Sequence, residues 1–326
     1  MERRRFVRFL ALGLAMPIAA AQSQGRRKIP RVGVLWHAGS EEQEREYYTV
    51  LMQAFHNLGY VDGSTAEFLH RYPAEQTDKF RQFAQELVDS KVDVIVSVTI
   101  RGTMALKQLN SSIPVVFVLA ADPVGSHLVE SLARPGSNMT GLSLMSEDLS
   151  GKRVAILKEA IPTLARLAFL MDPGDPNSMQ PAGARSTAQA LGIAFADVPV
   201  ARPDAIEPAF ARLAAEGFRA ALVGGSMFFN ERARVGRAAL DNKIATMSFI
   251  AEMVPYGLLV TYGPDFVEFF RLSAGLADKI LKGTRPAEIP IEQPTRIKQV
   301  INLKVARALN LTMPASLLIA SDVVLD

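Results

Sequence analysis

The stretch RPGSNMTGLS, residues 134–143, interrupts a regular alternation of expected strands and helices. It follows an apolar strand and a short polar turn, and it precedes a helical run. Its first five residues are typical of a turn, whereas MTGLS is typical of an extended segment. Loops between strands and helices are usually short. We therefore interpret this irregular connection as the place where the chain leaves one lobe and enters another.

The chain before this connection alternates between strands and helices. The run VDVIVSV is continuously apolar, as expected of a parallel strand that is covered on both faces. Gly59 is positioned to end the first helix. The order of elements predicts a doubly wound parallel sheet. We expect strands at 31–36, 67–71, 92–98 and 114–120, and helices at 41–58, 77–88 and 101–109.

The same alternation of strands and helices restarts after residue 143, which predicts a second unit of similar size. Its expected helices are 149–160, 178–191, 204–216 and 229–242, and its expected strands are 166–172, 193–198, 219–226 and 244–249.

Two further segments are interpreted as crossings between the lobes. Residues 257–265 are extended and turn at Gly263-Pro264, and 266–281 then reads as a helix. Residues 286–299 hold three prolines and lead into TRIKQVIN. We therefore expect a first lobe of 31–142 plus about 263–292, and a second lobe of 143–262 plus about 293–326.

The N-terminus has the layout of a secretory signal peptide. Four arginines lie among the first eight residues, and a run of 13 mostly apolar residues ends in three alanines before Gln22. This run is too short to cross a membrane. We expect a signal peptide at 1–21, a linker at 22–30 and export to the periplasm. Arg3-Arg4 leaves both a twin-arginine and a Sec signal open.

Composition excludes several functional classes. The chain has a net charge of +3, and its first 21 residues hold four Arg and one Glu, so the remainder is near neutral (+3 minus +3). No nucleic-acid partner or membrane span after signal removal is expected. The chain has no cysteine, and its four histidines are not spaced as a metal site. We expect no metal and no cofactor.

The candidate site lies in the loops after the strands, because doubly wound sheets bind ligands at the carboxyl ends of their strands. Thr99, Arg101, Gly102 and Thr103 lie between a strand and a helix start. The hydroxyl and backbone N–H groups there are suited to a carboxylate, and Arg101 to a bidentate contact. The alternatives are that Thr103 only caps the helix and that Arg101 is a solvated charge.

Other polar loops and single aromatic residues remain ambiguous. An Asp in a turn, such as Asp122 before Pro123, either bonds its own backbone or contacts a ligand ammonium. Trp36 stacks on a ligand or belongs to the core. Gly224-Gly225-Ser226 permits close backbone approach but is not a dinucleotide motif. The same ambiguities apply to Asp172, Asn177, Phe228 and Tyr262.

Catalytic motifs are missing from the sequence. It has no P-loop, no GxSxG and no supported Ser/His/Asp pattern. The sequence predicts a cleft without a visible catalyst. An exported enzyme remains an alternative, and it would need a pKa-shifted group such as Asp122, Asp172 or Asp175.

Nine stretches together resemble the periplasmic substrate-binding proteins of ABC transporters, in the branch described as an uncharacterised ABC-type periplasmic component. The resemblance covers residues 31–326. It implies an α/β fold of two Rossmann-like lobes with parallel sheets joined by a multi-strand hinge, like the type I periplasmic binding proteins. The stretches are RVGVLW, LGYVDG, KVDVIVSV, IPVVFV, DPVGSHLVESLARPGSNMTGLS, GKRVAILKEAIP, VTYGPD, DKILKGTRPAEIPIEQPTR and VINLKVARALNLTMPASLL.

The resemblance also implies a function. A receptor of an ABC importer would close on a small molecule, which we expect to be an amino acid or a small organic or aromatic acid. The closed form would dock as a monomer on an inner-membrane ABC permease. A ligand sensor for a signalling partner is the alternative.

The resemblance places a ligand carboxylate at 99–103 and 120–122, with second-lobe contacts from 172–178 and 224–228. The family commonly has smaller residues at three of these positions, Trp36, His37 and Arg101. We expect the larger side chains of this sequence to narrow the pocket or to favour an anionic ligand. The full expected set is Trp36, His37, Thr99, Arg101, Gly102, Thr103, Ala121, Asp122, Pro123, Asp172, Asn177, Ser226, Phe228 and Tyr262.

Overall fold

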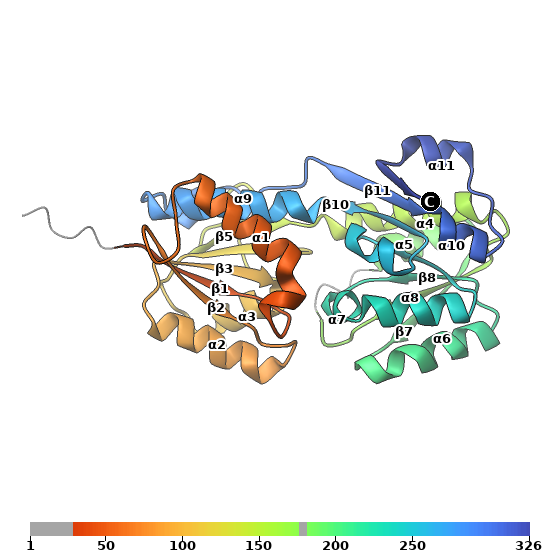
Figure 1. The fold of residues 1–326 in the computed structure, drawn as a ribbon, viewed down its shortest axis with the longest axis horizontal. Helices are drawn as coiled ribbons and strands as arrows, with labels where there is room; N and C mark the ends of the chain where they lie inside the picture. The colour runs from red at the N-terminus through yellow and green to blue at the C-terminus, as the bar shows by residue number, and fades with distance from the viewer. Residues whose placement is uncertain (1–28, 176–180) are drawn as a thin grey trace, which may run out of the picture.

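The protein consists of two α/β lobes that lie side by side (Figure 1). The structure is a computed structural model that describes residues 29–175 and 181–326. The expected signal peptide, most of the expected linker and Asn177 lie outside the described residues.

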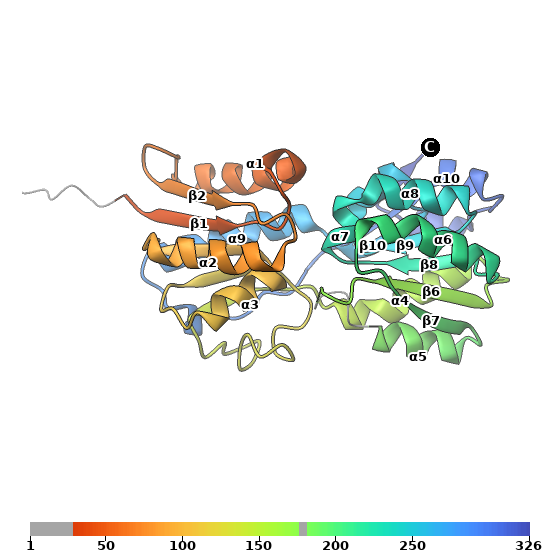
Figure 2. The same ribbon diagram turned by 90° about the horizontal axis from the view of Figure 1, so that it is seen from below.

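Lobe one is built on a five-stranded parallel sheet in the order β2-β1-β3-β4-β5. Helices α1 and α9 cover one face of this sheet, and α2 and α3 cover the other (Figures 1 and 2). The expected MTGLS extension is confirmed, because it forms the edge strand β5. The bounds are β1 (Arg31–Leu35), β2 (Glu67–Arg71), β3 (Val94–Thr99), β4 (Val115–Ala120), β5 (Met139–Ser143), α1 (Glu41–Asn57), α2 (Thr77–Asp89), α3 (Ile100–Gln108) and α9 (Phe266–Leu281).

Lobe two is built on a seven-stranded sheet in the order β12-β11-β10-β9-β8-β6-β7. All neighbouring strands are parallel except β10 and β11, which run antiparallel. The strands are β6 (Arg166–Met171), β7 (Ala194–Pro199), β8 (Ala220–Val223), β9 (Ala245–Ser248), β10 (Val260–Pro264), β11 (Ile297–Asn302) and β12 (Val323–Leu325).

The helices of lobe two lie on both faces of its sheet (Figure 2). The expected helix at 229–242 is wrong in one respect, because Glu231 separates two helices there. The expected strand at 219–226 is too long, since Gly225 has a φ of +117° and α7 begins at Ser226. The helices are α4 (Ser146–Ala160), α5 (Ala182–Ala190), α6 (Ile206–Ala215), α7 (Ser226–Asn230), α8 (Arg232–Asp241), α10 (Leu303–Ala308) and α11 (Ala315–Ala320), with 3₁₀ turns η2 (Pro203–Ala205), η3 (Ala251–Tyr256) and η4 (Pro286–Glu288).

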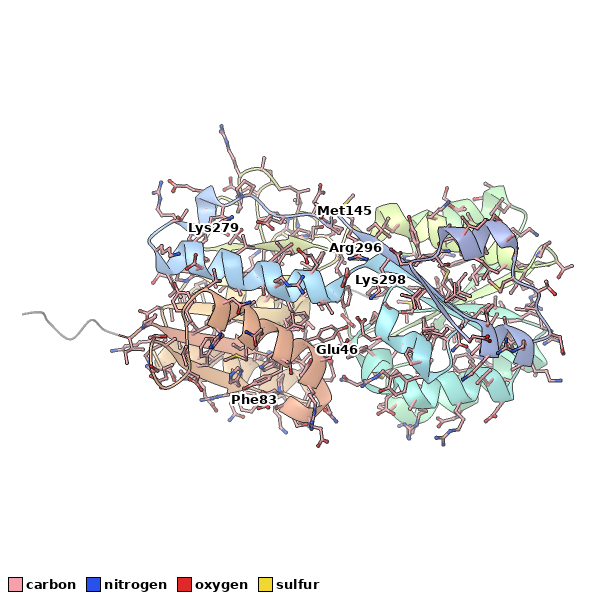
Figure 3. All side chains as sticks on the ribbon, turned by 45° about the horizontal axis from the view of Figure 1, so that its top comes forward. Glu46, Phe83, Met145, Lys279, Arg296 and Lys298 are labelled. Atoms are coloured by element: carbon pink, nitrogen blue, oxygen red, sulfur yellow. The ribbon has the colours of Figure 1, made fainter. Side chains whose placement is uncertain are left out.

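Three segments connect the lobes and form the expected hinge. The first follows β5 through Met145, the second joins β10 to α9, and the third leads from Glu292 into β11. The Glu292 carbonyl accepts the Ser143 N–H at 2.9 Å, which ties the third segment to β5. Met145, Arg296 and Lys298 mark the junction in Figure 3. Three connections between the same two lobes favour a hinge motion, in which one lobe rotates against the other, over free swinging of the lobes.

Buried apolar side chains run without a break from lobe one into lobe two. Tyr47 of α1 and Phe229 of α7 have ring centroids 5.8 Å apart. The two lobes are therefore closed against each other in this structure. Among the described residues, no helix is both long and apolar enough to span a membrane.

Candidate functional site

A cavity lies between the lobes at the carboxyl ends of β1, β3, β4 and β8. Its empty space is about 440 Å³, counting the part that opens to solvent. Small-molecule sites typically have mostly apolar linings. The lining residues are His37, Tyr47, Thr99, Leu119, Leu144, Gly225, Ser226, Phe229, Phe249, Ile250, Phe266 and Phe270.

Five of the twelve lining residues carry aromatic rings of the Tyr or Phe type. The rings of Tyr47 and Phe270 are stacked, with centroids 4.6 Å apart and planes inclined by 8°. Phe266 lies one helical turn before Phe270 on α9, so helices α1 and α9 supply three rings from lobe one. Phe229 and Phe249 supply the other two from lobe two. The cavity is thus suited to a flat, apolar ligand body.

The polar end of the cavity lies at the start of α3. Thr99 immediately precedes this helix, and its side chain does not cap the helix. The Thr99 hydroxyl is buried and has no hydrogen-bond partner among the described residues. The first N–H groups of a helix also lack partners within it and favour an anion. Together these groups are chemically suited to a negatively charged oxygen.

Ser226 closes the cavity from lobe two. Its backbone N–H and its hydroxyl both donate to the Asp175 Oδ2, at 3.0 and 3.2 Å. This carboxylate therefore fixes the start of α7, and with it the position of Phe229.

His37 is buried beside two carboxylates. Its Nδ1 lies 2.7 Å from the Glu75 Oε1, and its Nε2 lies 3.2 Å from the Glu44 Oε1. Burial by itself would lower the pKa of His37, but the charges of Glu44 and Glu75 outweigh it and raise the pKa to about 9. The ring is therefore charged at neutral pH, and both of its nitrogens are occupied by lobe one.

Glu75 is held in place by an unusual backbone. Ala74 and Glu75 both have left-handed φ angles, of +52° and +58°. Such a residue costs roughly 1–3 kcal/mol when it is not glycine. Hydrogen bonds from these two N–H groups to the Ala38 and His37 carbonyls, at 3.0 and 2.9 Å, fix the loop. In this backbone conformation the Glu75 carboxylate lies beside His37 and faces Asn230 of lobe two.

Glu75 and Arg101 carry the polar contacts that join the lobes beside the cavity. The Arg101 guanidinium donates to the Glu75 carbonyl at 2.9 Å and reaches the Asp172 Oδ2 of lobe two at 3.3 Å. The Asn230 side chain of lobe two lies 3.5 Å from the Glu75 Oε1. Arg101 thus connects the two lobes and does not line the cavity.

The variant Arg101→Met is expected to weaken ligand binding by about 5- to 30-fold. It removes a partly buried ion pair that is made only when the lobes are closed, which corresponds to about 1–2 kcal/mol, between the values for exposed and buried pairs. Calorimetry with the bound compound measures the loss, and small-angle scattering measures the opening. Arg81→Met is the control, because Arg81 pairs with Asp78 on an exposed face of α2. Unchanged affinity and an unchanged scattering radius in Arg101→Met would contradict this role.

The structure brings three of the sequence-predicted site residues together at the cavity, namely His37, Thr99 and Ser226. The others lie elsewhere. Arg101 and Asp172 form the ion pair between the lobes. Trp36 is fully buried, stacks on Tyr72 and Phe270, and donates from its indole N–H to His70 at 3.0 Å.

The remaining predicted residues have structural contacts. The Thr103 hydroxyl donates to the Thr99 carbonyl at 2.9 Å. The Asp122 Oδ1 accepts the Gly125 N–H at 2.8 Å, which is the turn-internal bond. The Tyr262 carbonyl accepts the Arg153 Nε–H at 2.8 Å in the hinge strand β10. Gly102, Ala121, Pro123 and Phe228 are buried and do not line the cavity.

Sequence reasoning missed most of the aromatic lining. Phe249 follows β9 directly, so the rule for strand ends that selected His37 and Thr99 also selects Phe249. Tyr47, Phe266 and Phe270 lie within helices, where apolar residues at helical spacing look like core. Glu44 and Glu75 carried no signal in the sequence, because their roles depend on contacts with His37.

Solved structures and a curated protein are similar to this chain. A conserved domain protein from Vibrio cholerae has a TM-score of 0.85 at 23% identity, with 91% of this chain and 100% of that chain covered. An ABC domain in complex with L-Trp from Streptococcus pneumoniae has a TM-score of 0.83 at 22% identity, with 91% and 99% covered. The tyrosine-binding protein of Clostridioides difficile is 21% identical over 262 residues, which is 80% of this chain and 75% of that protein.

A family model also matches most of the chain. Its description is ABC transporter substrate binding protein, and the match spans residues 40–325. The structural neighbours share the two-lobed fold of solute-binding proteins. The chain therefore belongs to the ABC transporter substrate-binding protein family, whose members bind a solute and are not enzymes.

Proposed function

We propose that this substrate-binding protein takes an aromatic amino acid or a related small aromatic acid into its interlobe cavity. The observation that carries the proposal is the combination of five aromatic rings with a Thr99 hydroxyl at the start of α3 that has no partner in the described part of the chain. The rings would enclose the apolar body of the ligand. The Thr99 hydroxyl and the first N–H groups of α3 would bind its carboxylate.

Ring burial would supply most of the affinity. Aromatic side chains gain about 0.5–1.5 kcal/mol per ring pair beyond the burial of area itself. A ligand ring between Tyr47 and Phe249 would contact both lobes, so it would stabilise their closed arrangement. The names of two similar proteins, which mention tyrosine and L-Trp, support this ligand class.

Substrate-binding proteins of this family work with an ABC permease, and we propose that this one does so in the periplasm. The apolar N-terminal run supports export, since it has the charge and length of a signal peptide. N-terminal sequencing of the protein from a periplasmic fraction should begin at Gln22. Retention of residues 1–21 in the cytoplasmic fraction would contradict export.

Thermal unfolding against a panel of compounds tests the ligand class. The panel holds L-tryptophan, L-tyrosine, L-phenylalanine, 3-phenylpropionate, L-leucine and D-glucose. A compound at 100 times its dissociation constant stabilises the folded state by about 2.7 kcal/mol. Shifts with the aromatic acids alone would support the proposal, and a shift with glucose or leucine alone would overturn it.

Thr99→Val is expected to lower the affinity for an aromatic carboxylate by about 10- to 150-fold. A hydrogen bond to a charged group contributes about 1.5–3 kcal/mol, and valine keeps the shape of threonine while removing the hydroxyl. Calorimetry measures the affinity. Thr103→Val is the matched control, because this hydroxyl bonds within lobe one and should affect stability alone. Equal losses of affinity in both variants would contradict the assignment.

A further inference from the structure

A second pocket lies at the amino end of the lobe-two sheet. The interlobe cavity lies where β8 ends, whereas this pocket lies where β6, β8 and β9 begin. Its empty space is about 880 Å³, counting the part open to solvent. We call it the basic pocket, because Arg166, Arg219 and Lys243 are among its lining residues.

The alignment of three strands gathers these cations. Arg166 is the first residue of β6, Arg219 directly precedes β8, and Lys243 comes two residues before β9. These strands are neighbours in the sheet and run parallel, with β6 paired to β8 and β8 paired to β9. Parallel neighbours begin at the same edge of a sheet, so the three positive side chains meet there.

None of the three cations forms an ion pair with a residue that the structure describes. Most arginines in the described ranges do form one, as Arg185 does with Asp197 and Arg234 with Glu207. No carboxylate is among the described residues that line the basic pocket. Its positive charge is therefore not balanced by the side chains around it.

Backbone and ring contacts hold the two arginines in place. The Arg166 guanidinium lies over the Phe218 ring, 4.4 Å from its centroid, and donates to the Glu216 carbonyl. The Arg219 guanidinium donates to the Phe218 carbonyl at 3.3 Å. The Glu216 carboxylate itself pairs with Arg212 on α6. Carbonyls and a ring position these side chains without cancelling their charge, so less conformational entropy is lost when an anion binds.

The rest of the lining is mostly apolar. Leu164 is 3% exposed and belongs to the core of lobe two. Leu309 and Leu311 follow α10, pack against the same core and are partly exposed in the pocket. An apolar surface beside unbalanced cations suits a ligand that joins an anionic head to an apolar chain.

Three cations favour a doubly charged head over a single carboxylate. A phosphate monoester carries about −1.5 to −2 charges at neutral pH and has three strong acceptor oxygens. Arginine binds phosphate oxygens with two parallel hydrogen bonds, and lysine binds them as a point charge. A phosphate monoester therefore matches both the charge and the donors of the basic pocket.

We propose that the basic pocket is a second binding site, which takes a phosphate monoester with an apolar chain. The phosphate binds to Arg166, Arg219 and Lys243, and the chain packs on the three leucines. This site does not depend on closure of the lobes, because all of its described lining belongs to lobe two.

Calorimetry with hexyl phosphate and methyl phosphate tests both parts of the site. The two esters carry the same head and differ in the length of the chain. Each methylene group that becomes buried strengthens binding by about 4-fold, so hexyl phosphate is expected to bind at least about 10-fold more tightly. Equal affinity for the two esters, or no binding of either, would overturn the proposal.

Variants assign the binding to the basic pocket. Arg219→Gln and Lys243→Gln are each expected to weaken hexyl phosphate binding by about 3- to 30-fold, between the effects of an exposed ion pair and of a charge-assisted hydrogen bond. Both side chains are exposed, so the fold should tolerate the changes. Arg237→Gln is the matched control, because Arg237 of α8 is also exposed and lies outside the pocket lining. Equal losses in all three variants would reveal only a general attraction of anions to the surface, and would overturn the site.

The interlobe cavity also suits an anion with an apolar body, so the experiment must separate the two sites. Arg219→Gln is expected to weaken binding of the ester and to leave the affinity for aromatic acids unchanged. An ester bound in the cavity would keep its full affinity in Arg219→Gln and in Lys243→Gln, and that result would overturn the second site. The aromatic-acid function is tested separately, by the compound panel and by Thr99→Val.

Discussion

Raising the pH from about 6.5 to about 9 is expected to remove about 3 kcal/mol from the free energy of unfolding. The cause is His37, whose pKa of about 9 in the folded protein compares with 6.5 for the free side chain. Because the folded pKa is the higher one, the stabilisation is complete below pH 6.5 and is lost as the pH rises through 9. Each unit of difference corresponds to about 1.4 kcal/mol.

Few other groups titrate in this range. The chain has no cysteine and only four histidines. Burial lowers the pKa of His70 to about 4, so that ring is neutral in the folded protein and adds only a smaller slope of opposite sign near pH 6.5, where it titrates in the unfolded chain. The carboxylates that face His37 are Glu44, Glu75 and Asp175, and all three act to raise its pKa. The slope in this window should therefore report mainly on His37.

Urea unfolding at pH 6, 7.5 and 9 measures this slope. His37→Gln is expected to cost about 3 kcal/mol at pH 6, because it leaves the buried Glu44 and the partly buried Glu75 without this cation, and to flatten the slope. His56→Gln is the control, since His56 is exposed in the last turn of α1. A wild-type protein that is equally stable at pH 6 and pH 9 would show that His37 is not held as a cation.

The architecture of both lobes could be predicted from the sequence because each buried strand is a continuous apolar run between amphipathic helices. VDVIVSV covers all of β3 except Thr99, and β3 is buried at every position. The strand at 219–226 was extended too far because its glycines and Ser226 carry no helical pattern. The antiparallel pairing of β10 and β11 was not visible, since direction depends on how the chain returns through the hinge.

The site was predicted only in part. His37, Thr99 and Ser226 were found because each follows a strand whose carboxyl end faces the cavity. Phe228 was selected and Phe229 was not, although they are neighbours. Successive residues of a helix point about 100° apart, so α7 directs Phe229 into the cavity and Phe228 into the core. The sequence shows the helix but not its rotation.

Gly263→Ala is expected to destabilise the protein by about 3 kcal/mol or more and to weaken ligand binding. A Cβ atom at Gly263 would lie 2.1 Å from the Phe249 backbone oxygen and 2.8 Å from its carbonyl carbon. These are backbone atoms, so relief requires β10 to move away from the chain after β9. Overpacking of this kind costs about 1–3 kcal/mol where neighbours can shift, and more where they cannot. Phe249 and Ile250 line the cavity and would move with it.

Gly275→Ala separates this effect from a general loss of glycine. A Cβ atom at Gly275, in the middle of α9, would meet no atom within 4 Å. Alanine is the better helix former by about 0.5–1 kcal/mol, so this variant should be more stable than the wild type. Both variants replace glycine with alanine, and the expected changes in the free energy of unfolding have opposite signs. Urea unfolding measures these changes, and calorimetry measures ligand affinity in both variants. If Gly263→Ala were as stable as the wild type and bound ligand equally well, β10 would not be fixed against Phe249, and the hinge strand would not position the cavity wall.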